Sequence, residues 1–297
     1  MRVSECRAAS AAARAFVGSL LIPTLHKPDL KTFLAFRERS PDSPVLITGA
    51  LQPWKLKQWT PDKLRCLDVQ VPLEMSKGGA DYRDAFRDDV NENGVTHIQR
   101  ESNPNRAFIA GHLSSLKSFC DTFLMPSSKT YSTTAYLAQY DLVSKVPELN
   151  EACGETPAFL CEGGLGENNK FMRNTWLGPR DTVTPLHREP YHNLFCQAWG
   201  VKRLLLYPST EPDSTMCAFP KTNGFLKNTS MIDPECLQSI DTQENGAEFL
   251  MMARTRGFQV ELKSGEALFL PKGTWHHVRS LEPSLSISYW WEDRIGR

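Results

Sequence analysis

The chain has 297 residues, of which 40% are hydrophobic, and its 34 Lys and Arg balance its 34 Asp and Glu. This content can fill a core, which excludes a disordered chain, and the balance gives no overall attraction for nucleic acid or for a membrane surface. No apolar run reaches the roughly 18 residues that a membrane-spanning helix needs. Eight cysteines without a CxxC pair favour a reduced intracellular compartment, either cytoplasm or nucleus.

The first residues allow two interpretations. Residues 1–22 contain Arg2, Arg7 and Arg14, a single acid at Glu5, and an Ala-rich stretch. An ordinary amphipathic first helix is the simpler interpretation. A mitochondrial presequence is the alternative, because such targeting peptides are rich in Arg and poor in acids.

The first half of the chain mixes predicted helices and strands. Residues 31–39 place Phe33, Leu34 and Phe36 at helical spacing, and the apolar run 44–49 ends in Gly and predicts a buried strand. Four more segments follow: a helix at 61–64, a strand at 69–75, a polar surface excursion at 76–105 and a helix at 113–123.

The second half is predicted to consist mostly of strands. The expected strands are 131–137, 174–177, 191–199, 202–207, 258–262, 267–270, 276–281 and 285–291, with an irregular stretch at 208–256. Short strands separated by regular turn signals are typical of a closed sandwich or barrel. No internal repeat and no strong linker divides the chain.

The sharpest local feature is the segment Thr184–Pro190, which contains His187 and Glu189. On an extended segment, residues i and i+2 point to the same face, so both side chains can reach one ion. An imidazole and a carboxylate make two thirds of the facial triad of non-haem Fe(II) oxygenases. On its own, however, a His-x-Glu pair is a weak signal.

A third ligand must come from another strand. His276 and His277 lie in a predicted core strand, and because they are adjacent they point to opposite faces. Only one of them can join His187 and Glu189, and the spacing does not select between them.

Six segments together resemble the Jumonji-C (JmjC) family of Fe(II)- and 2-oxoglutarate-dependent oxygenases, most closely its small protein-hydroxylase branch. They are Pro44–Gly49, Tyr136–Gln139, Asn174–Pro179, Thr184–Pro190, Gly200–Lys202 and Gly265–Val278. The resemblance implies a double-stranded β-helix, a cupin-like jelly roll that is mainly β with flanking helices. It also implies a catalytic domain at 31–297, with its core at about 130–291, behind an N-terminal segment at 1–30.

The resemblance assigns roles to particular residues. The family's distal ligand lies in a Trp-His-x-Val segment, which selects His276 over His277, and the family often has Asp where this chain has Glu189. Lys202 matches the residue that binds the far carboxylate of 2-oxoglutarate. Tyr136, Thr184 and Asn193 match its polar neighbours. The implied cofactor is Fe(II), with 2-oxoglutarate and O₂ as co-substrates.

The implied reaction is hydroxylation of a C–H bond, and the implied partner is a protein or peptide. Glu74, Trp176 and Trp290 match substrate-side positions, where an acid and aromatic rings suit a Lys or Arg side chain. The same residues could instead be a surface acid and core packing. Demethylation of Lys or Arg by the same chemistry, a non-catalytic binding module and a cupin of other chemistry, such as an isomerase, remain alternatives. The sequence does not fix the oligomeric state.

Overall fold

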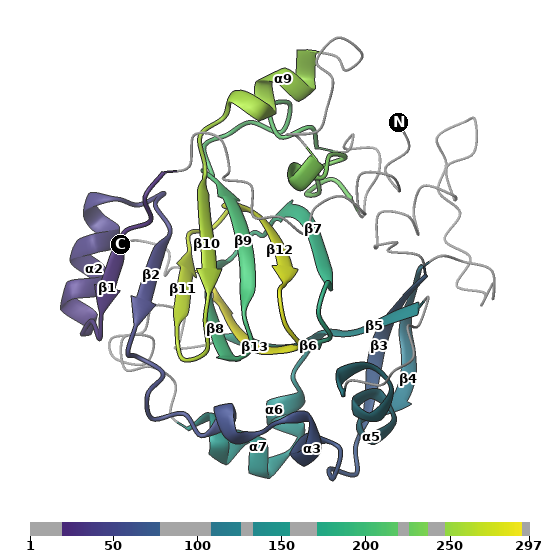
Figure 1. The fold of residues 1–297 in the computed structure, drawn as a ribbon. Helices are drawn as coiled ribbons and strands as arrows, with labels where there is room; N and C mark the ends of the chain where they lie inside the picture. Colours follow the sequence, from purple (N-terminus) through teal and green to yellow (C-terminus); the bar gives the residue numbers. More distant parts are fainter. Residues whose placement is uncertain are drawn as a thin grey trace.

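Two β-sheets packed face to face form the centre of the protein (Figure 1). The computed structural model describes residues 20–77, 108–125, 133–154, 171–218, 226–236 and 247–292. The strands of the larger sheet are β1 (Thr24–His26), β2 (Val45–Thr48), β3 (Gln70–Lys77), β4 (Phe108–Ser115), β5 (Thr133–Tyr140), β6 (Met172–Gly178), β8 (His192–Trp199), β11 (Ala267–Leu270) and β13 (Ser284–Trp291). Those of the smaller sheet are β7 (Val183–Arg188), β9 (Lys202–Tyr207), β10 (Phe258–Leu262) and β12 (Trp275–Ser280).

The strand order is that of a jelly roll. The nine-stranded sheet has the order β1-β2-β11-β8-β13-β6-β5-β3-β4, and the four-stranded sheet has the order β10-β9-β12-β7. From β6 to β13, consecutive strands alternate between the two sheets, except for β9 and β10, which pair with each other in the small sheet. The predicted fold class, a mainly β jelly roll with flanking helices, is confirmed.

An apolar core fills the space between the sheets. Its members come from both layers and include Phe195 and Leu268 from the large sheet and Leu204, Leu206 and Val278 from the small one. Leu204 and Leu206 are two residues apart, so they share one face of β9, and both are fully buried. The same face of β9 begins with Lys202, which places a cationic side chain at the end of this core.

Five of the helices pack on the other face of the large sheet. They are α2 (Leu30–Arg39), α3 (Pro61–Leu64), α5 (Leu116–Phe119), α6 (Leu142–Lys145) and α7 (Pro147–Cys153). In α2, the Asp29 side chain caps the helix by accepting from the Thr32 backbone N–H at 2.8 Å, and Phe33 and Phe36 enter this second core. No helix in the described part of the chain is long and apolar enough to cross a bilayer.

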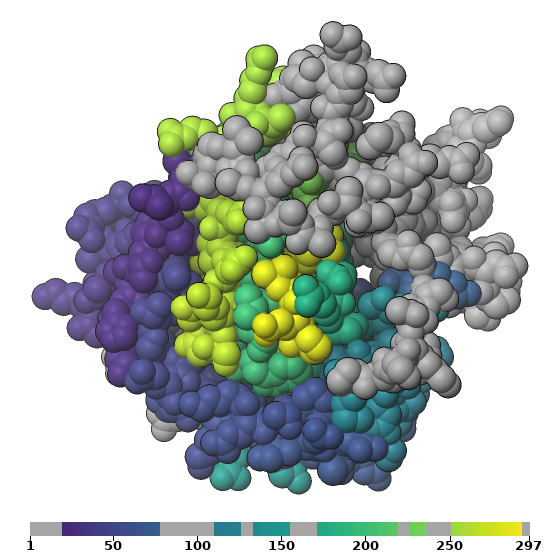
Figure 2. Space-filling view, in the orientation of Figure 1, coloured from purple at the N-terminus to yellow at the C-terminus, as the bar shows by residue number. Residues whose placement is uncertain are grey.

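The outer face of the small sheet carries a third cluster. Trp275 and Tyr207 of that sheet pack there with Ile232 and with Met252 from α9 (Ala247–Arg254). In the orientation of Figure 1, the space-filling view shows β12 in yellow near the centre of this face, with β10 in light green farther to the left (Figure 2).

A glycine sets the position of Lys202. Gly200 joins β8 to β9 with a φ of +76°, and a Cβ there would lie 2.3 Å from the carbonyl oxygen of Pro283. Only glycine fits this close approach in a left-handed conformation. The turn therefore brings Lys202 into the sandwich at the first position of β9.

Two of the predicted elements differ from the structure. The helix expected at 113–123 begins only at Leu116, because Ser115 ends β4 and its hydroxyl accepts from the Ser118 backbone N–H at 3.1 Å. The stretch 208–256, predicted to be irregular, contains α9. Residues 1–19, with the predicted helix or presequence, and 78–107, with most of the polar excursion, lie outside the described residues.

Candidate metal centre

The side chains of His187 and His276 come together at the small sheet, and Glu189 lies beside His187. His187 on β7 lies opposite His276 on β12 in the strand register, and their ring centroids are 4.1 Å apart. The Nε2 atom of His187 lies 3.4 Å from Oε1 of Glu189. The two histidines are 6% and 7% exposed, so the group sits at the border of the buried core.

Both histidines are oriented by their own backbone. Nδ1 of His187 lies 2.8 Å from the Pro185 carbonyl oxygen, and Nδ1 of His276 lies 2.9 Å from that of Thr274. A carbonyl only accepts, so each Nδ1 carries a proton, and Nε2 is the ring atom that each histidine can offer to a metal. Burial, and then the nearby His187, lower the pKa of His276 well below its ordinary value. A neutral imidazole with a free Nε2 is the form that binds a metal.

A bulge in β7 turns His187 and Thr184 to the same face. His276 pairs with His187, and Val278 pairs with Thr184, so the three residues 276–278 of β12 face the four residues 184–187 of β7. Without the extra residue, positions 184 and 187 would point to opposite faces. The bulge contains Pro185, whose missing N–H would leave a gap in a regular ladder.

The candidate residues lie in a row along the inner face of the small sheet. Down β12, His276 faces His187, Val278 faces Thr184, and Ser280 faces Lys202 on β9. His276 and Ser280 are four steps apart along the strand, which places their Cα atoms roughly 13 Å apart. The Lys202 side chain extends from the Ser280 end toward His276. Together with a five-carbon dicarboxylate, it can cover this separation.

Lys202 is a fully buried cation without an anionic partner in the described part of the chain. Its Nζ donates to the Tyr136 hydroxyl at 3.2 Å and lies 5.2 Å from the centre of the Phe195 ring. Burial lowers the pKa of Lys202 from 10.5 to about 7. Burying an amine without a carboxylate is costly, which makes this position suited to the carboxylate of a ligand.

Tyr136, Thr184 and Asn193 also lie inside the sandwich. Burial raises the pKa of the Tyr136 phenol, the charge of Glu74 raises it further, and a side-chain hydrogen bond with Thr184 lowers it. Asn193 on β8 is 4% exposed, and its Oδ1 has no hydrogen-bond partner among the described residues. A buried amide oxygen without a partner fits a ligand donor or a water.

An aromatic row leads away from Tyr136. Ring centroids are 6.1 Å apart for Tyr136 and Trp176, 6.4 Å for Trp176 and Trp290, and 6.0 Å for Trp290 and Tyr191. Glu74 on β3 lies directly opposite Tyr136 in the register, and burial raises the pKa of its carboxyl from 4.5 to about 7. The sequence analysis did not assign Tyr191 to the site. Its position two residues after Glu189 could have indicated that it faces the same side.

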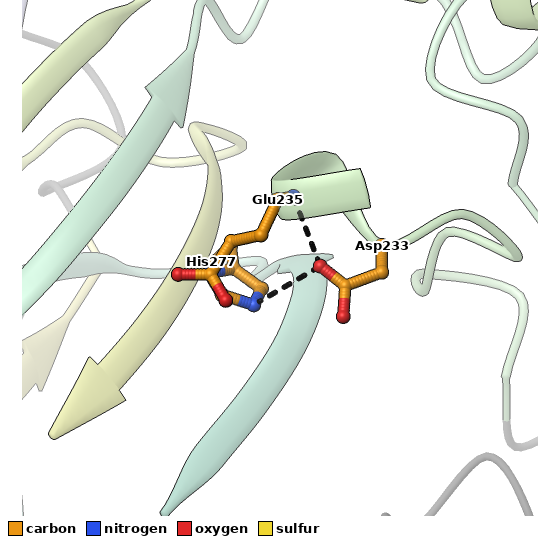
Figure 3. A group of neighbouring side chains, drawn as sticks. All are labelled: Asp233, Glu235 and His277. Carbon is orange, nitrogen blue, oxygen red and sulfur yellow. Dashed lines mark hydrogen bonds and ion pairs between the residues drawn. The ribbon is translucent and has the colours of Figure 1, made fainter. Parts of the chain in front are cut away.

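His277 lies on the outer face of β12, with a second group of donors (Figure 3). Donor atoms of Asp233, Glu235 and His277 lie within 4.8 Å of one another. Glu235, however, is held by Arg279, whose Nε lies 2.6 Å from its Oε2, and Nη1 of Arg203 lies 4.0 Å from its Oε1. The guanidinium groups of Arg279 and Arg203 thus already neutralise the charge of the Glu235 carboxylate. Sequence analysis missed this group, for which the Asp-Pro-Glu run at 233–235 was the available signal.

A jelly roll that brings two histidines and a carboxylate together on the inner face of its smaller sheet defines a cupin-like protein. The family profile described as "Cupin-like domain" matches residues 34–297, and the chain belongs to this family. The resemblance found in the sequence is confirmed, since its relatives include proteins named for the JmjC domain.

Three relatives show the range of named activities. Jumonji C domain-containing protein 5 of Drosophila melanogaster is 29% identical over 273 residues, 91% of this chain and 60% of that protein. Lysine-specific demethylase 8 of Danio rerio is 29% identical over 276 residues, 91% of this chain and 58% of that protein. The bifunctional peptidase and (3S)-lysyl hydroxylase JMJD7 of Homo sapiens is 24% identical over 314 residues, 97% of this chain and 90% of that protein. The chain thus spans less than two thirds of the first two relatives.

Proposed function

We propose that this protein is an Fe(II)- and 2-oxoglutarate-dependent oxygenase that hydroxylates a C–H bond on a Lys or Arg side chain of a protein. Residues 31–297 would form its catalytic domain, with the core at about 130–291. Relatives named as a lysine-specific demethylase and a lysyl hydroxylase support oxygenase chemistry on protein substrates.

His187, Glu189 and His276 would hold the iron. Two imidazoles held by hydrogen bonds at Nδ1 and one carboxylate leave coordination positions open for other ligands. When bound, iron together with 2-oxoglutarate and O₂ supplies the oxidising power for attack on a C–H bond. The residues of the chain orient the ligands and exclude water, as the 6% and 7% exposure of the two histidines favours.

The observation that carries the proposal is the buried amine of Lys202. It lies on the same inner face as His276, and Thr184 lies between them along the sheet. Lys202 would bind the far carboxylate of 2-oxoglutarate, while the hydroxyls of Tyr136 and Thr184 add hydrogen bonds. A cupin of another chemistry, such as an isomerase, has no need for a buried cation at this distance from the metal.

The substrate side chain would enter along the aromatic row. Trp176, Trp290 and Tyr191 offer ring faces to a cation, and Glu74 offers a carboxylate beside Tyr136. Hydroxylation of an N-methyl group would release formaldehyde and give demethylation. Demethylation is the second candidate function, because one relative is named as a demethylase. The free thiols of Cys66, Cys120, Cys153 and Cys196 accord with an intracellular location.

The first experiment adds Fe(II) and then 2-oxoglutarate to the purified protein without oxygen. We expect a visible charge-transfer band from the chelated keto acid, which the folded variant His187→Ala should lack. Absence of the band in folded wild-type protein would refute the oxygenase and favour a non-catalytic module or another metal chemistry. Succinate release with unmodified and with N-methylated Lys and Arg peptides then separates hydroxylase from demethylase.

A further inference from the structure

A short segment runs along the free edge of the small sheet. Residues 226–236, here called the strap, lie beside β7, which is the edge strand in the order β10-β9-β12-β7. The Ser230 backbone N–H donates to the Leu186 carbonyl at 2.8 Å, and the Arg188 N–H donates to the Asn228 carbonyl at 2.9 Å. Between them, Thr229 forms an isolated bridge with His187. The strap therefore pairs with the part of β7 that carries a proposed iron ligand.

The strap supports β7 where its pairing with β12 is irregular. Between the His187–His276 pair and the Thr184–Val278 pair, the bulge interrupts the ladder. Leu186 lies inside the bulge, and its carbonyl accepts from the strap. Without the strap, the position of His187 relative to His276 would depend on a locally broken ladder alone.

The far end of the strap reaches the outer face of β12. Asp233 Oδ1 lies 3.7 Å from Nε2 of His277, and it also accepts from the Glu235 backbone N–H at 3.0 Å. Glu235 forms the ion pair with Arg279, two residues after His277 on the same face. Figure 3 shows Asp233 and Glu235 converging on His277 from the short helical turn that ends the strap. These contacts are buried, with 5% and 8% exposed side chains for the two acids.

We infer that the strap fixes the distance between the two histidine-bearing strands, with Asp233 and Glu235 as positioning residues. One end holds β7 through its backbone, and the other holds β12 through His277 and Arg279. His277 is the direct chain neighbour of His276, so a shift of β12 at this point moves the iron ligand. The inference rests on the proposed function in one respect, namely that the site positioned by the strap is an iron site.

The alternative is that Asp233, Glu235 and His277 themselves bind a metal. The ion pair of Glu235 with Arg279 argues for the positioning role, because a divalent ion would have to displace a guanidinium group. The two roles differ in the number of ions bound and in the response of the inner site.

The test measures Co(II) binding and its visible ligand-field spectrum in the full chain. The variants are Asp233→Asn and Glu235→Gln, which keep side-chain size, and Asp181→Asn is the matched control. Asp181 also faces Arg279, at 3.7 Å, but its side chain is 68% exposed and belongs to neither the strap nor the metal group. Circular dichroism and thermal unfolding of the metal-free proteins identify the folded fraction of each.

We expect wild type to bind one Co(II), and Asp233→Asn and Glu235→Gln to bind it about 10- to 100-fold more weakly with shifted ligand-field bands. Asp181→Asn should stay within about twofold of wild type. Wild-type affinity and spectrum in both folded strap variants would overturn the inference and leave the proposed function intact. One ion retained by His187→Ala would also overturn it, in favour of a metal site on the outer face. No Co(II) bound to wild type would refute the proposed iron site and the inference with it.

Discussion

Replacing Lys202 by Met should make the protein more stable and less able to bind 2-oxoglutarate. Lys202 is fully buried, and its pKa is lowered from 10.5 to about 7. At about 1.36 kcal/mol for each tenfold change in proton affinity, this corresponds to a penalty on the order of 4–5 kcal/mol for charging the buried amine. Met has a similar length and no charge. Because the replacement removes this penalty, we expect a higher melting temperature without ligand.

The stability difference should depend on pH. The folded protein holds the Lys202 proton less tightly than the unfolded chain does, so the unfolded chain binds more protons between about pH 7 and 10.5. The contribution of Lys202 therefore makes wild type more stable as pH rises through this window. The advantage of Lys202→Met should be largest near pH 7 and should shrink toward pH 10.

The ligand response should change in the opposite direction. A charge-assisted hydrogen bond contributes about 1.5–3 kcal/mol, so 2-oxoglutarate should bind Lys202→Met roughly 10- to 150-fold more weakly. The assay is urea unfolding at pH 7 and pH 9.5, combined with an anaerobic titration of 2-oxoglutarate into Fe(II)-loaded protein. A variant that is less stable than wild type at pH 7, or that keeps wild-type affinity for 2-oxoglutarate, would refute the role given to this amine.

Three further predictions test other parts of the site. His276→Ala should abolish Fe(II) binding in a metal titration, whereas His277→Ala should still bind iron at a higher Fe(II) concentration. The reverse result would make His277 the ligand in place of His276. Binding of a Lys or Arg peptide should strengthen from pH 6 to pH 8, because the Glu74 carboxyl, with a pKa raised to about 7, loses its proton in that range. Glu74→Gln should remove this dependence in a fluorescence titration, and an unchanged pH profile would exclude Glu74. Gly200→Ala should lower the free energy of unfolding by roughly 2–3 kcal/mol in urea, because its Cβ would lie 2.3 Å from the Pro283 carbonyl oxygen; a loss below about 0.5 kcal/mol would contradict the turn geometry.

The strands were predictable because their apolar patterns are simple. The runs Leu204–Tyr207 and Ala267–Leu270 are apolar, follow a glycine turn by a few residues and end at a proline, and both lie in strands of the structure. The start of the helix at Leu116 was not predictable from apolar spacing, because Leu113 continues the helical pattern. Leu113 instead lies on the edge strand β4, where it is 66% exposed, and the capping hydroxyl of Ser115 decides the boundary.

The candidate site was predictable only in part. The i, i+2 spacing of His187 and Glu189 gave their shared direction, but the choice of His276 over His277 required the family resemblance. In the structure His276 faces His187 on the neighbouring strand, while His277 faces Asp233 on the other side of the sheet. The bulge that turns Thr184 inward depends on the partner strand, so spacing along one strand could not reveal it.

Lys202 and Glu74 together explain how one site can accept two ligands of opposite charge. Both groups contact or face Tyr136, and burial moves the pKa of each to about 7. Near neutral pH, each can therefore lose its charge while its ligand is absent, which lowers the cost of burying it. An anionic co-substrate favours the protonated amine, and a cationic side chain favours the ionised carboxyl. Each ligand thus stabilises the charge that binds it, and the two proton movements are opposite in sign.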